Sequence, residues 1–308
     1  MKWLIRSEEY SITPFGHYPG ARPLEEHIQN GMIILDKPSG PTSHQVDAWI
    51  KKILNINKCS HGGTLDPRAS GVLVIVLVNA TKLMPIILSS DKEYVALIYL
   101  HKDVPRREIE KVLKEFVGKI KQIPPKKSAV ARRERVREIY YLEILDIEKR
   151  EILIKVGCEA GTYIRRLADD VGKKLGTGAH LQESRRTKSG NFSEDRVVTI
   201  QDIMDAKEEN KLKDVILPME LIIESIGKVI VKDSAIANIC NGAPLAVGGI
   251  VRIEEEIEDG DWVAMLSLKG ELISLGKALM NSKEMMGRRG IAVKTDSVLM
   301  KKGIYPKI

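Results

Sequence analysis

The sequence has few cysteines for its length and no long run of apolar residues. Its 308 residues include three cysteines, Cys59, Cys158 and Cys240, which lie far apart and form no C-x-x-C pair. An odd number of isolated cysteines supports neither a disulfide framework nor a structural zinc site, so we expect reduced thiols. The longest apolar run, Val72 to Val78, is far shorter than the ~20 residues that cross a bilayer. Because a secretory signal pattern is also missing, the sequence predicts a soluble, cytoplasmic protein.

Signatures of nucleotide cofactors are missing as well. The glycine-rich segment from Ser60 to Leu73 lacks the Gly-Lys-Ser/Thr ending of a phosphate-binding loop, and Gly176-Thr177-Gly178 is no dinucleotide fingerprint. Positive charge, in contrast, is in excess, since 49 Lys and Arg against 42 Asp and Glu give a net charge of +7. This excess is a weak indication of a polyanionic partner.

Two clusters concentrate the positive charge. The first has one acidic residue, Glu134, among six basic ones: Lys126, Lys127, Arg132, Arg133, Arg135 and Arg137. The second consists of Arg185, Arg186 and Lys188. A charge run is often only a solvated surface, and for either cluster alone this alternative stays open. Because the two clusters flank the candidate active site, we expect them to bind phosphate groups.

Short strands and helices alternate irregularly through the first two thirds of the chain. Strands are predicted over 32–35, 71–78, 94–100 and 152–158, and helices from a cap at Thr42 or Ser43 to about Leu54 and over 107–116, 163–175 and 199–209. Because no βαβ period repeats, the expected fold class is α+β with a mixed, largely antiparallel sheet. Short β segments after residue 227 predict a small β-barrel. The predicted domains are an N-terminal arm (1–30) that packs on the C-terminal domain, a catalytic domain (31–226) and the barrel (227–308).

Two segments are candidates for chemistry. In the first, three glycines and a proline within twelve residues shape a loop around Asp66. Taken alone, Asp66-Pro67 is typical of a helix N-terminus. In the second, a strand ends at Cys158, and Tyr163 and Arg165 follow at the mouth of a helix. Taken alone, this segment is compatible with a simple helix cap at Thr162.

Three separated motifs occur in a specific order. They are Asp36-Lys37-Pro38-x-Gly40-x-Thr42-Ser43, Gly62-Gly63-Thr64-Leu65-Asp66-Pro67-x-Ala69-x-Gly71-x-Leu73 and Gly161-Thr162-Tyr163-Ile164-Arg165. Together they resemble the TruB and dyskerin family of RNA pseudouridine synthases. Pro124-Pro125 and the arginine-rich segment 132–137 are similar to the archaeal and eukaryotic dyskerin branch, and the C-terminal region is similar to an RNA-binding PUA domain. The resemblance covers essentially the whole chain.

The resemblance implies roles for individual residues. The family's catalytic aspartate falls on Asp66, its active-site tyrosine on Tyr94, and the arginine that pairs with the aspartate on Arg165, with the aromatic Tyr163 beside it. His61 matches the histidine that fills the space left by a flipped nucleotide. The expected RNA contacts are His61 together with Lys37, which also supports the catalytic loop, and the arginines Arg132, Arg133, Arg135, Arg185 and Arg186. Two departures, Ser60-His61-Gly62-Gly63 for the usual Gly-His-Ser-Gly and Arg165-Arg166 for the usual Arg-Thr, leave Asp66 untouched.

The implied reaction explains why a carboxylate is needed. Uracil must be detached from the ribose at N1, rotated and rejoined through C5. Asp66 could attack C1′ of the ribose or C6 of the base, and the sequence leaves both routes open. No metal or redox cofactor is called for. The implied partners are tRNA or rRNA as substrate, an H/ACA guide RNA and small proteins of the same ribonucleoprotein.

Two alternatives to this enzyme stay open from the residues alone. One is a catalytically idle RNA-binding scaffold, in which the barrel and the basic cluster do all the binding. The other is a glycosidase with paired carboxylates, which requires a second acid near Asp66, and Asp169 or Asp170 is the nearest candidate in sequence.

Overall fold

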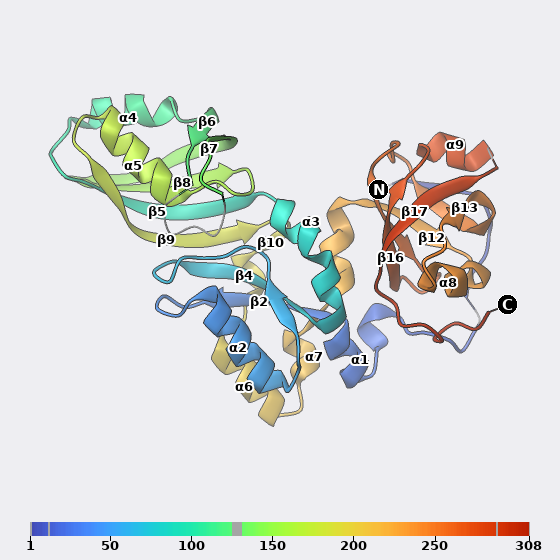
Figure 1. The fold of residues 1–308 in the computed structure, drawn as a ribbon. Coiled ribbons are helices and arrows are strands. Elements are labelled where there is room, and N and C mark those ends of the chain that lie inside the picture. The colour runs from blue at the N-terminus through green and yellow to red at the C-terminus, as the bar shows by residue number, and fades with distance from the viewer. Residues whose placement is uncertain (1, 12, 125–130, 288, 308) are drawn as a thin grey trace. The chain divides into compact units, whose positions relative to one another are not determined.

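The computed structural model describes residues 2–11, 13–124, 131–287 and 289–307, so Lys126 and Lys127 of the first basic cluster lie outside the described residues. Contacts divide the chain into two units (Figure 1). Unit 1 contains Met1–Met32, Val76–Leu83 and Asn210–Ile308, and unit 2 contains Ile33–Ile75 and Met84–Glu209. No helix in the described ranges is long and apolar enough to cross a membrane.

Unit 2 is built on a long mixed sheet with the strand order β2-β4-β9-β5-β8-β7-β6. Its strands are β2 (Gly31–Lys37), β4 (Ser70–Leu77), β5 (Lys92–Leu100), β6 (Gly118–Gln122), β7 (Arg135–Glu148), β8 (Glu151–Cys158) and β9 (Ala179–Ser189), with β3 (Cys59–His61) paired to β4 and β10 (Phe192–Ser193) to β9. The β4–β9 pair is parallel, whereas the pairs from β9 through β5, β8 and β7 to β6 are antiparallel. The expected α+β fold class with a largely antiparallel sheet is confirmed.

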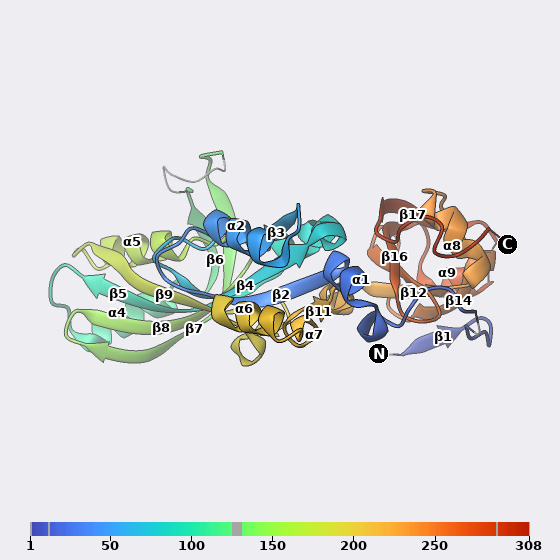
Figure 2. The same ribbon diagram turned by 90° about the horizontal axis from the view of Figure 1, so that it is seen from below.

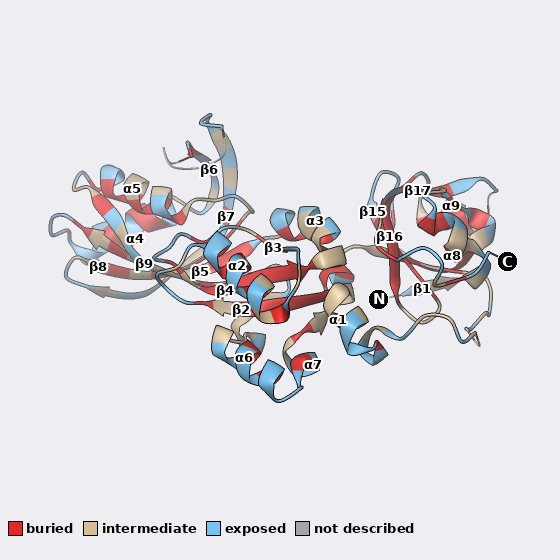
Figure 3. Cartoon of the chain, turned by 60° about the horizontal axis from the view of Figure 1, so that its bottom comes forward, coloured by how far each residue is buried: buried red, intermediate tan, exposed pale blue. Residues whose placement is uncertain are grey.

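Helices cover this sheet where the sequence supplies apolar faces. The helices of unit 2 are α2 (Ser43–Leu54), α3 (Met84–Ser89), α4 (Arg106–Lys114), α5 (Ile164–Lys174) and α6 (Ile200–Glu208). Helices α4 and α5 share one apolar core with β5, β7 and β8 (Figure 1). In β4, residues Val72 to Leu77 are fully buried, as the continuous apolar run predicts for a strand covered on both faces (Figure 3).

Unit 1 contains a seven-stranded sheet with the order β1-β14-β12-β15-β16-β17-β13. Most strands of this sheet curve round one core (Figure 2). They are β12 (Gly227–Val231), β14 (Ile250–Glu254), β15 (Trp262–Leu266), β16 (Leu272–Ala278) and β17 (Ile291–Val298). The same core contains residues of β13 (Leu245–Ala246), α8 (Asp233–Cys240) and α9 (Ser282–Gly287). Also in unit 1 are α7 (Leu212–Val215), β11 (Leu217–Pro218) and the 3-10 helices Pro19–Ala21, Val78–Leu83, Met219–Ser225 and Val247–Gly249, while a further 3-10 turn, Glu194–Arg196, belongs to unit 2.

The N-terminal segment has more regular structure than the sequence predicts. It forms β1 (Trp3–Ile5), which pairs antiparallel with β14, and the helix α1 (Leu24–Gln29). The Arg6 guanidinium donates to the carbonyls of Met285 and Met286 at 2.9 and 2.7 Å, and the Lys269 ammonium donates to carbonyls of residues 13, 15 and 16. These contacts order a segment whose prolines and glycines alone predict little structure, because they supply partners for its backbone groups.

A glycine at the start of β4 permits a close backbone approach. Gly71 has φ +98°, and a Cβ there would lie 2.3 Å from the carbonyl oxygen and 2.8 Å from the amide nitrogen of Arg186. Gly118 has the same φ, and a Cβ there would meet no atom within 4 Å. We expect Gly118→Ala to cost about 1 kcal/mol from left-handed strain, and Gly71→Ala about 3 kcal/mol or more because two strands must also separate. Urea denaturation of both variants measures the difference, and equal costs would contradict the crowding argument.

Candidate active site

The loop that carries Asp66 is held by the motif that begins at Asp36. The Lys37 ammonium donates to the carbonyls of Pro38 and Ala69 at 2.8 Å and of Pro67 at 3.3 Å. Lys37 is fully buried, and burial lowers the pKa of its ammonium, with the neighbouring Arg186 charge acting in the same direction. Lys37 therefore supports the loop from inside. The expected RNA contact by Lys37 is corrected for this reason, because a buried ammonium with three carbonyl partners offers nothing to a phosphate.

The helix cap and the loop are joined at one point. The Thr42 side chain accepts from the Gln45 amide in a capping box that begins α2, as predicted. Ser43 exchanges hydrogen bonds with Leu65, donating to its carbonyl at 3.1 Å and accepting from its amide at 3.0 Å.

No helix follows Asp66-Pro67 in the described segment 62–69, which forms turns. The alternative in which Asp66 is a helix N-cap is therefore wrong, and its carboxylate is left for another partner.

That partner is Arg165. Strand β8 ends at Cys158, and α5 begins at Ile164 with Tyr163 as the N-cap residue, so Arg165 lies in the first turn of the helix. Its guanidinium forms an ion pair with the Asp66 carboxylate, and both side chains are about half exposed. The backbone of Tyr163 is fixed by Gln122, whose side chain accepts from the Tyr163 amide at 2.9 Å and donates to its carbonyl at 3.2 Å. Three motifs far apart in sequence thus meet at a half-exposed, ion-paired carboxylate.

Arg186 lies under this site. Its side chain is 1% exposed and donates to the carbonyls of Val72 and Gly63 at 2.7 and 3.1 Å. Burial, the dominant effect, raises the pKa of the neighbouring Tyr94 phenol, whereas the Arg186 charge opposes the shift. The expectation that Arg186 binds phosphate is therefore corrected. A strand in the middle of the sheet carries this residue, and its guanidinium is solvated by carbonyls of the Asp66 loop and β4.

The second basic cluster is largely engaged in ion pairs. Arg185 donates to Asp36 at 3.0 and 2.9 Å and pairs with Glu194, and the Lys188 ammonium lies 3.9 Å from the buried Glu93. In the first cluster, Arg132 and Arg133 are exposed and Arg135 is partly buried at the start of β7. Exposed arginines of this kind remain candidates for phosphate contact, whereas the paired ones have lower capacity to bind it.

His61 lies at the end of β3 and is 7% exposed. Its Nδ1 is 2.7 Å from Asp47 Oδ2, and its Nε2 is 3.2 Å from Thr64 Oγ1. The sequence reasoning missed Asp47, although an acidic residue on the buried face of a helix is a signal that could have marked it. The same reasoning missed Lys92, whose ammonium donates to the Ile87 carbonyl at 2.9 Å and to the Ser90 carbonyl at 2.5 Å.

Lys92 gives the protein a measurable pH dependence. Burial, with help from the Arg186 charge, lowers the pKa of the Lys92 ammonium to about 8, from an ordinary value of 10.5. Between these values the unfolded chain binds more protons than the folded one, so the free energy of unfolding rises with pH. Relative to Lys92→Met, we expect wild type to gain roughly 2 kcal/mol between pH 7 and 9.5. Urea midpoints at both pH values test this, and parallel pH profiles of the two proteins would contradict it.

The paired-carboxylate alternative finds no second acid at Asp66. Asp169 lies 3.5 Å and Asp170 3.4 Å from the Arg166 guanidinium, and Lys173 also pairs with Asp170. These carboxylates are engaged on the surface of α5, so the described site holds one carboxylate, Asp66, with a guanidinium partner.

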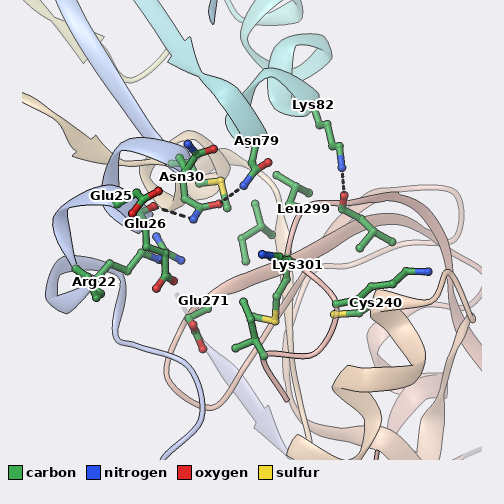
Figure 4. A pocket seen from close by; sticks show the side chains of 18 residues that line it. Arg22, Glu25, Glu26, Asn30, Asn79, Lys82, Cys240, Glu271, Leu299 and Lys301 are labelled. Atoms are coloured by element: carbon green, nitrogen blue, oxygen red, sulfur yellow. Dashed lines mark hydrogen bonds and ion pairs between the residues drawn. The ribbon is translucent and has the colours of Figure 1, made fainter. Parts of the chain in front are cut away.

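A cavity of about 790 Å³ lies in unit 1 (Figure 4). Arg22 on its wall pairs with Glu220 at 2.6 Å and Glu26 at 3.5 Å, and Asn79 donates to Asn30 at 3.1 Å. Its lining contains none of the predicted site residues.

Family models match almost the whole chain. They are the DKCLD (NUC011) domain over residues 1–47, the N-terminal domain of the TruB family pseudouridylate synthases over 51–105 and 101–164, the tRNA pseudouridylate synthase B C-terminal domain over 165–224 and the PUA domain over 227–299. The chain is 52% identical over 315 residues to a "probable tRNA pseudouridine synthase B" of Pyrococcus horikoshii, covering 99% of this chain and 94% of the relative.

Solved structures are similar over the same length. A chain of the archaeal box H/ACA sRNP Nop10-Cbf5 complex is 46% identical with a TM-score of 0.90, and covers 100% of this chain and 98% of that chain. A chain of an H/ACA RNP bound to a substrate RNA containing 2′-deoxyuridine is 48% identical with a TM-score of 0.91, over 99% and 96% of the two chains.

These matches and the site define an RNA-modifying isomerase with an appended PUA domain. The chain belongs to the TruB family of pseudouridylate synthases. The predicted family and the predicted activity, isomerisation of uridine to pseudouridine in RNA, are confirmed.

Proposed function

We propose that Asp66 is the nucleophile that converts uridine to pseudouridine in this protein. The observation that carries the proposal is the ion pair between Asp66 and Arg165, formed where the three motifs meet. An ion pair uses the carboxylate in its charged form, which is the form that attacks carbon. Lys37 and Ser43 hold the loop on either side of Asp66, so the carboxylate is presented by a preorganised backbone.

The reaction is an isomerisation and needs no co-reactant. Asp66 forms a bond to C1′ of the ribose or to C6 of the uracil, the C1′–N1 bond breaks, and the base rotates within the site. A C1′–C5 bond then forms, and in the C1′ route the C1′–O bond to Asp66 breaks in the same step. The C5 proton leaves to solvent and N1 takes up a proton. In the C6 route the C6–O bond to Asp66 then breaks. Atoms and electrons balance, because one ring proton is lost and one is gained.

Neighbouring residues have distinct roles in this proposal. Tyr94 packs against the flipped base, and its phenol, kept protonated by burial, donates a proton or a hydrogen bond during the rearrangement. Arg165 orients Asp66, and Tyr163 lines the base site beside it. His61 is 7% exposed and lies between Asp47 and Thr64, so we assign it to support of the loop and not to the space that the flipped nucleotide leaves in the RNA. Exposed Arg132 and Arg133, with Arg135, contact phosphates.

Substrate and partners follow from what the relatives are named for. The Pyrococcus relative is named for tRNA, and the similar structures are an H/ACA sRNP complex with Nop10 and an H/ACA RNP with substrate RNA. We therefore propose two substrate classes: the T-loop uridine of tRNA, and rRNA uridines selected by an H/ACA guide RNA with small partner proteins. The cytoplasm, expected from the sequence, stays a prediction.

Tritium release from C5 of labelled uridine tests the proposal. Two assays are compared. The first uses the lone chain on unmodified tRNA. The second uses the chain with guide RNA and partner proteins on a guide-matched rRNA fragment. Release in the first assay supports a standalone tRNA enzyme, and release only in the second supports a guided one. Tight RNA binding without release in either assay would contradict the proposal and favour the idle scaffold.

A further inference from the structure

Asp47 is a buried acid whose partner lies in the catalytic loop region. It faces inward from α2 and is 8% exposed. Burial of a carboxylate is costly unless the charge is paired. Among the described residues, the groups within ion-pair distance of Asp47 are His61 at 2.7 Å and the exposed His44 at 3.9 Å. The close partner, His61, therefore stabilises the buried carboxylate through a hydrogen bond.

The contact sets the protonation pattern of the His61 ring. An ionised carboxylate only accepts hydrogen bonds, so Nδ1 of His61 carries the proton that lies between the two groups. In the neutral ring, Nε2 then has a free lone pair and accepts from Thr64 Oγ1 at 3.2 Å. Thr64 is two residues before Asp66 in the same loop. The hydrogen-bond chain thus runs from α2 through the ring to the loop that carries the nucleophile.

One further hydrogen bond helps to hold this chain in place. The Cys59 thiol donates to the Asp47 carbonyl at 3.3 Å and joins β3 to α2. His44 lies with its ring edge against the His61 ring, at 5.0 Å between centroids, but is largely solvent-exposed. Asp47 Oδ1 is buried and has no hydrogen-bond partner in the part of the chain that the structure describes. The carboxylate therefore makes its side-chain hydrogen bond through Oδ2 to His61, since His44, at 3.9 Å from the same oxygen, lies beyond hydrogen-bond distance.

We propose that Asp47 is a positioning residue for catalysis: its carboxylate fixes the rotation and the tautomer of His61, and through His61 and Thr64 it orders the loop around Asp66. The proposal rests on the proposed function, in which the loop carries the nucleophile. It adds Asp47, a residue of α2, to the groups that hold this loop. Asp47 touches no substrate; it acts through the imidazole.

The first test is independent of activity. Long-range ¹H–¹⁵N spectra of the imidazoles, with His61 assigned by the signals missing in His61→Ala, report the tautomer directly. We expect the Nδ1–H tautomer in wild type and its loss, or a mixture of tautomers, in Asp47→Asn. A wild-type His61 protonated on Nε2 alone would overturn the proposal, whether or not the protein is active.

The second test is a double-mutant cycle on single-turnover pseudouridylation. We expect Asp47→Asn to slow the reaction about tenfold, the scale of one lost charge-assisted hydrogen bond, with RNA affinity unchanged. In the His61→Ala background the same substitution should slow it less than twofold, because Asp47 has no ring left to position. An equal loss in both backgrounds would overturn the proposal. If wild type itself released no tritium, the proposed function would fail, while the tautomer measurement would still decide the role of Asp47.

His44→Ala is the matched control. His44, Asp47 and His61 have potential ligand atoms within 4.8 Å of one another, so a metal ion is the rival explanation for this cluster. We expect His44→Ala to retain its rate within twofold and a chelator to leave wild type unchanged. Loss of activity in His44→Ala together with inhibition by the chelator would overturn positioning by hydrogen bonding in favour of a metal site.

Discussion

Asp66→Asn is expected to lower tritium release by at least about 10³-fold while the protein stays folded and bound to RNA. Removal of a nucleophile eliminates the covalent route, and losses of this size or larger are typical. The substitution costs little stability, because the carboxylate is about half exposed and its ion pair with Arg165 is worth at most about 1 kcal/mol. Single-turnover rates, melting temperature and RNA affinity are measured on the same preparation.

Asp103→Asn provides the matched control for Asp66. Asp103 is also an exposed acid in an ion pair, with Arg150 at 2.8 Å, and it takes no part in the three motifs. The substitution Asp103→Asn should leave the single-turnover rate unchanged within twofold. Asp66→Ala repeats the test without a side chain that can deamidate back to aspartate. Turnover above about 1% of wild type in both Asp66 variants would show that Asp66 is not the nucleophile.

Tyr94→Phe is expected to reduce the single-turnover rate by about 10²-fold with little change in RNA affinity. Phenylalanine keeps the flat ring that stacks on a base but removes the hydroxyl, and loss of a positioned proton donor costs about 10²–10⁴-fold. Burial raises the pKa of the Tyr94 phenol, so the group is neutral and able to donate throughout the neutral range. Tyr94→Leu should lower the rate further, because stacking of the base is lost as well.

Tyr99 offers the control on the same strand. It lies five residues further along β5, and its ring contacts that of His180 at 5.5 Å between centroids. Tyr99→Phe should retain the wild-type rate within twofold. If Tyr94→Phe were equally active, the phenol would have no part in proton transfer, and only the stacking role would survive.

The scaffold alternative is separated from the enzyme by these same variants. A scaffold would bind RNA without releasing tritium, so neither Asp66→Asn nor Tyr94→Phe could change its behaviour. The support of the Asp66 loop argues for the enzyme on physical grounds. Lys37 and Arg186 donate hydrogen bonds to carbonyls of this loop and hold it in one shape. Such support has a purpose where a reacting group must be positioned.

The sequence by itself determined several local elements and the family, and it marked Asp66, Tyr94 and Arg165 as candidates for the reaction. Helix α2 begins at its Thr42 capping box, and β4 follows its apolar run, because caps and strand burial depend on neighbours close in sequence. The motif around Asp66 also predicted which residue Arg165 would meet. The Asp66-Pro67 cap failed as an alternative because the loop, held by Lys37 and Ser43, turns away from helical geometry.

Only the tertiary structure decided which charged side chains face inward. Arg185 and Arg186 are neighbours in a basic run, yet Arg185 pairs with Asp36 near the surface while Arg186 is buried beside Tyr94 of the neighbouring strand. Their directions alternate because they lie on a strand, and that strand, β9, was not predicted from its polar sequence. Asp47 and Lys92 are hidden for the same physical reason: a buried charge is stabilised by partners far away in sequence, and these partners come together only when the sheet and α2 are assembled.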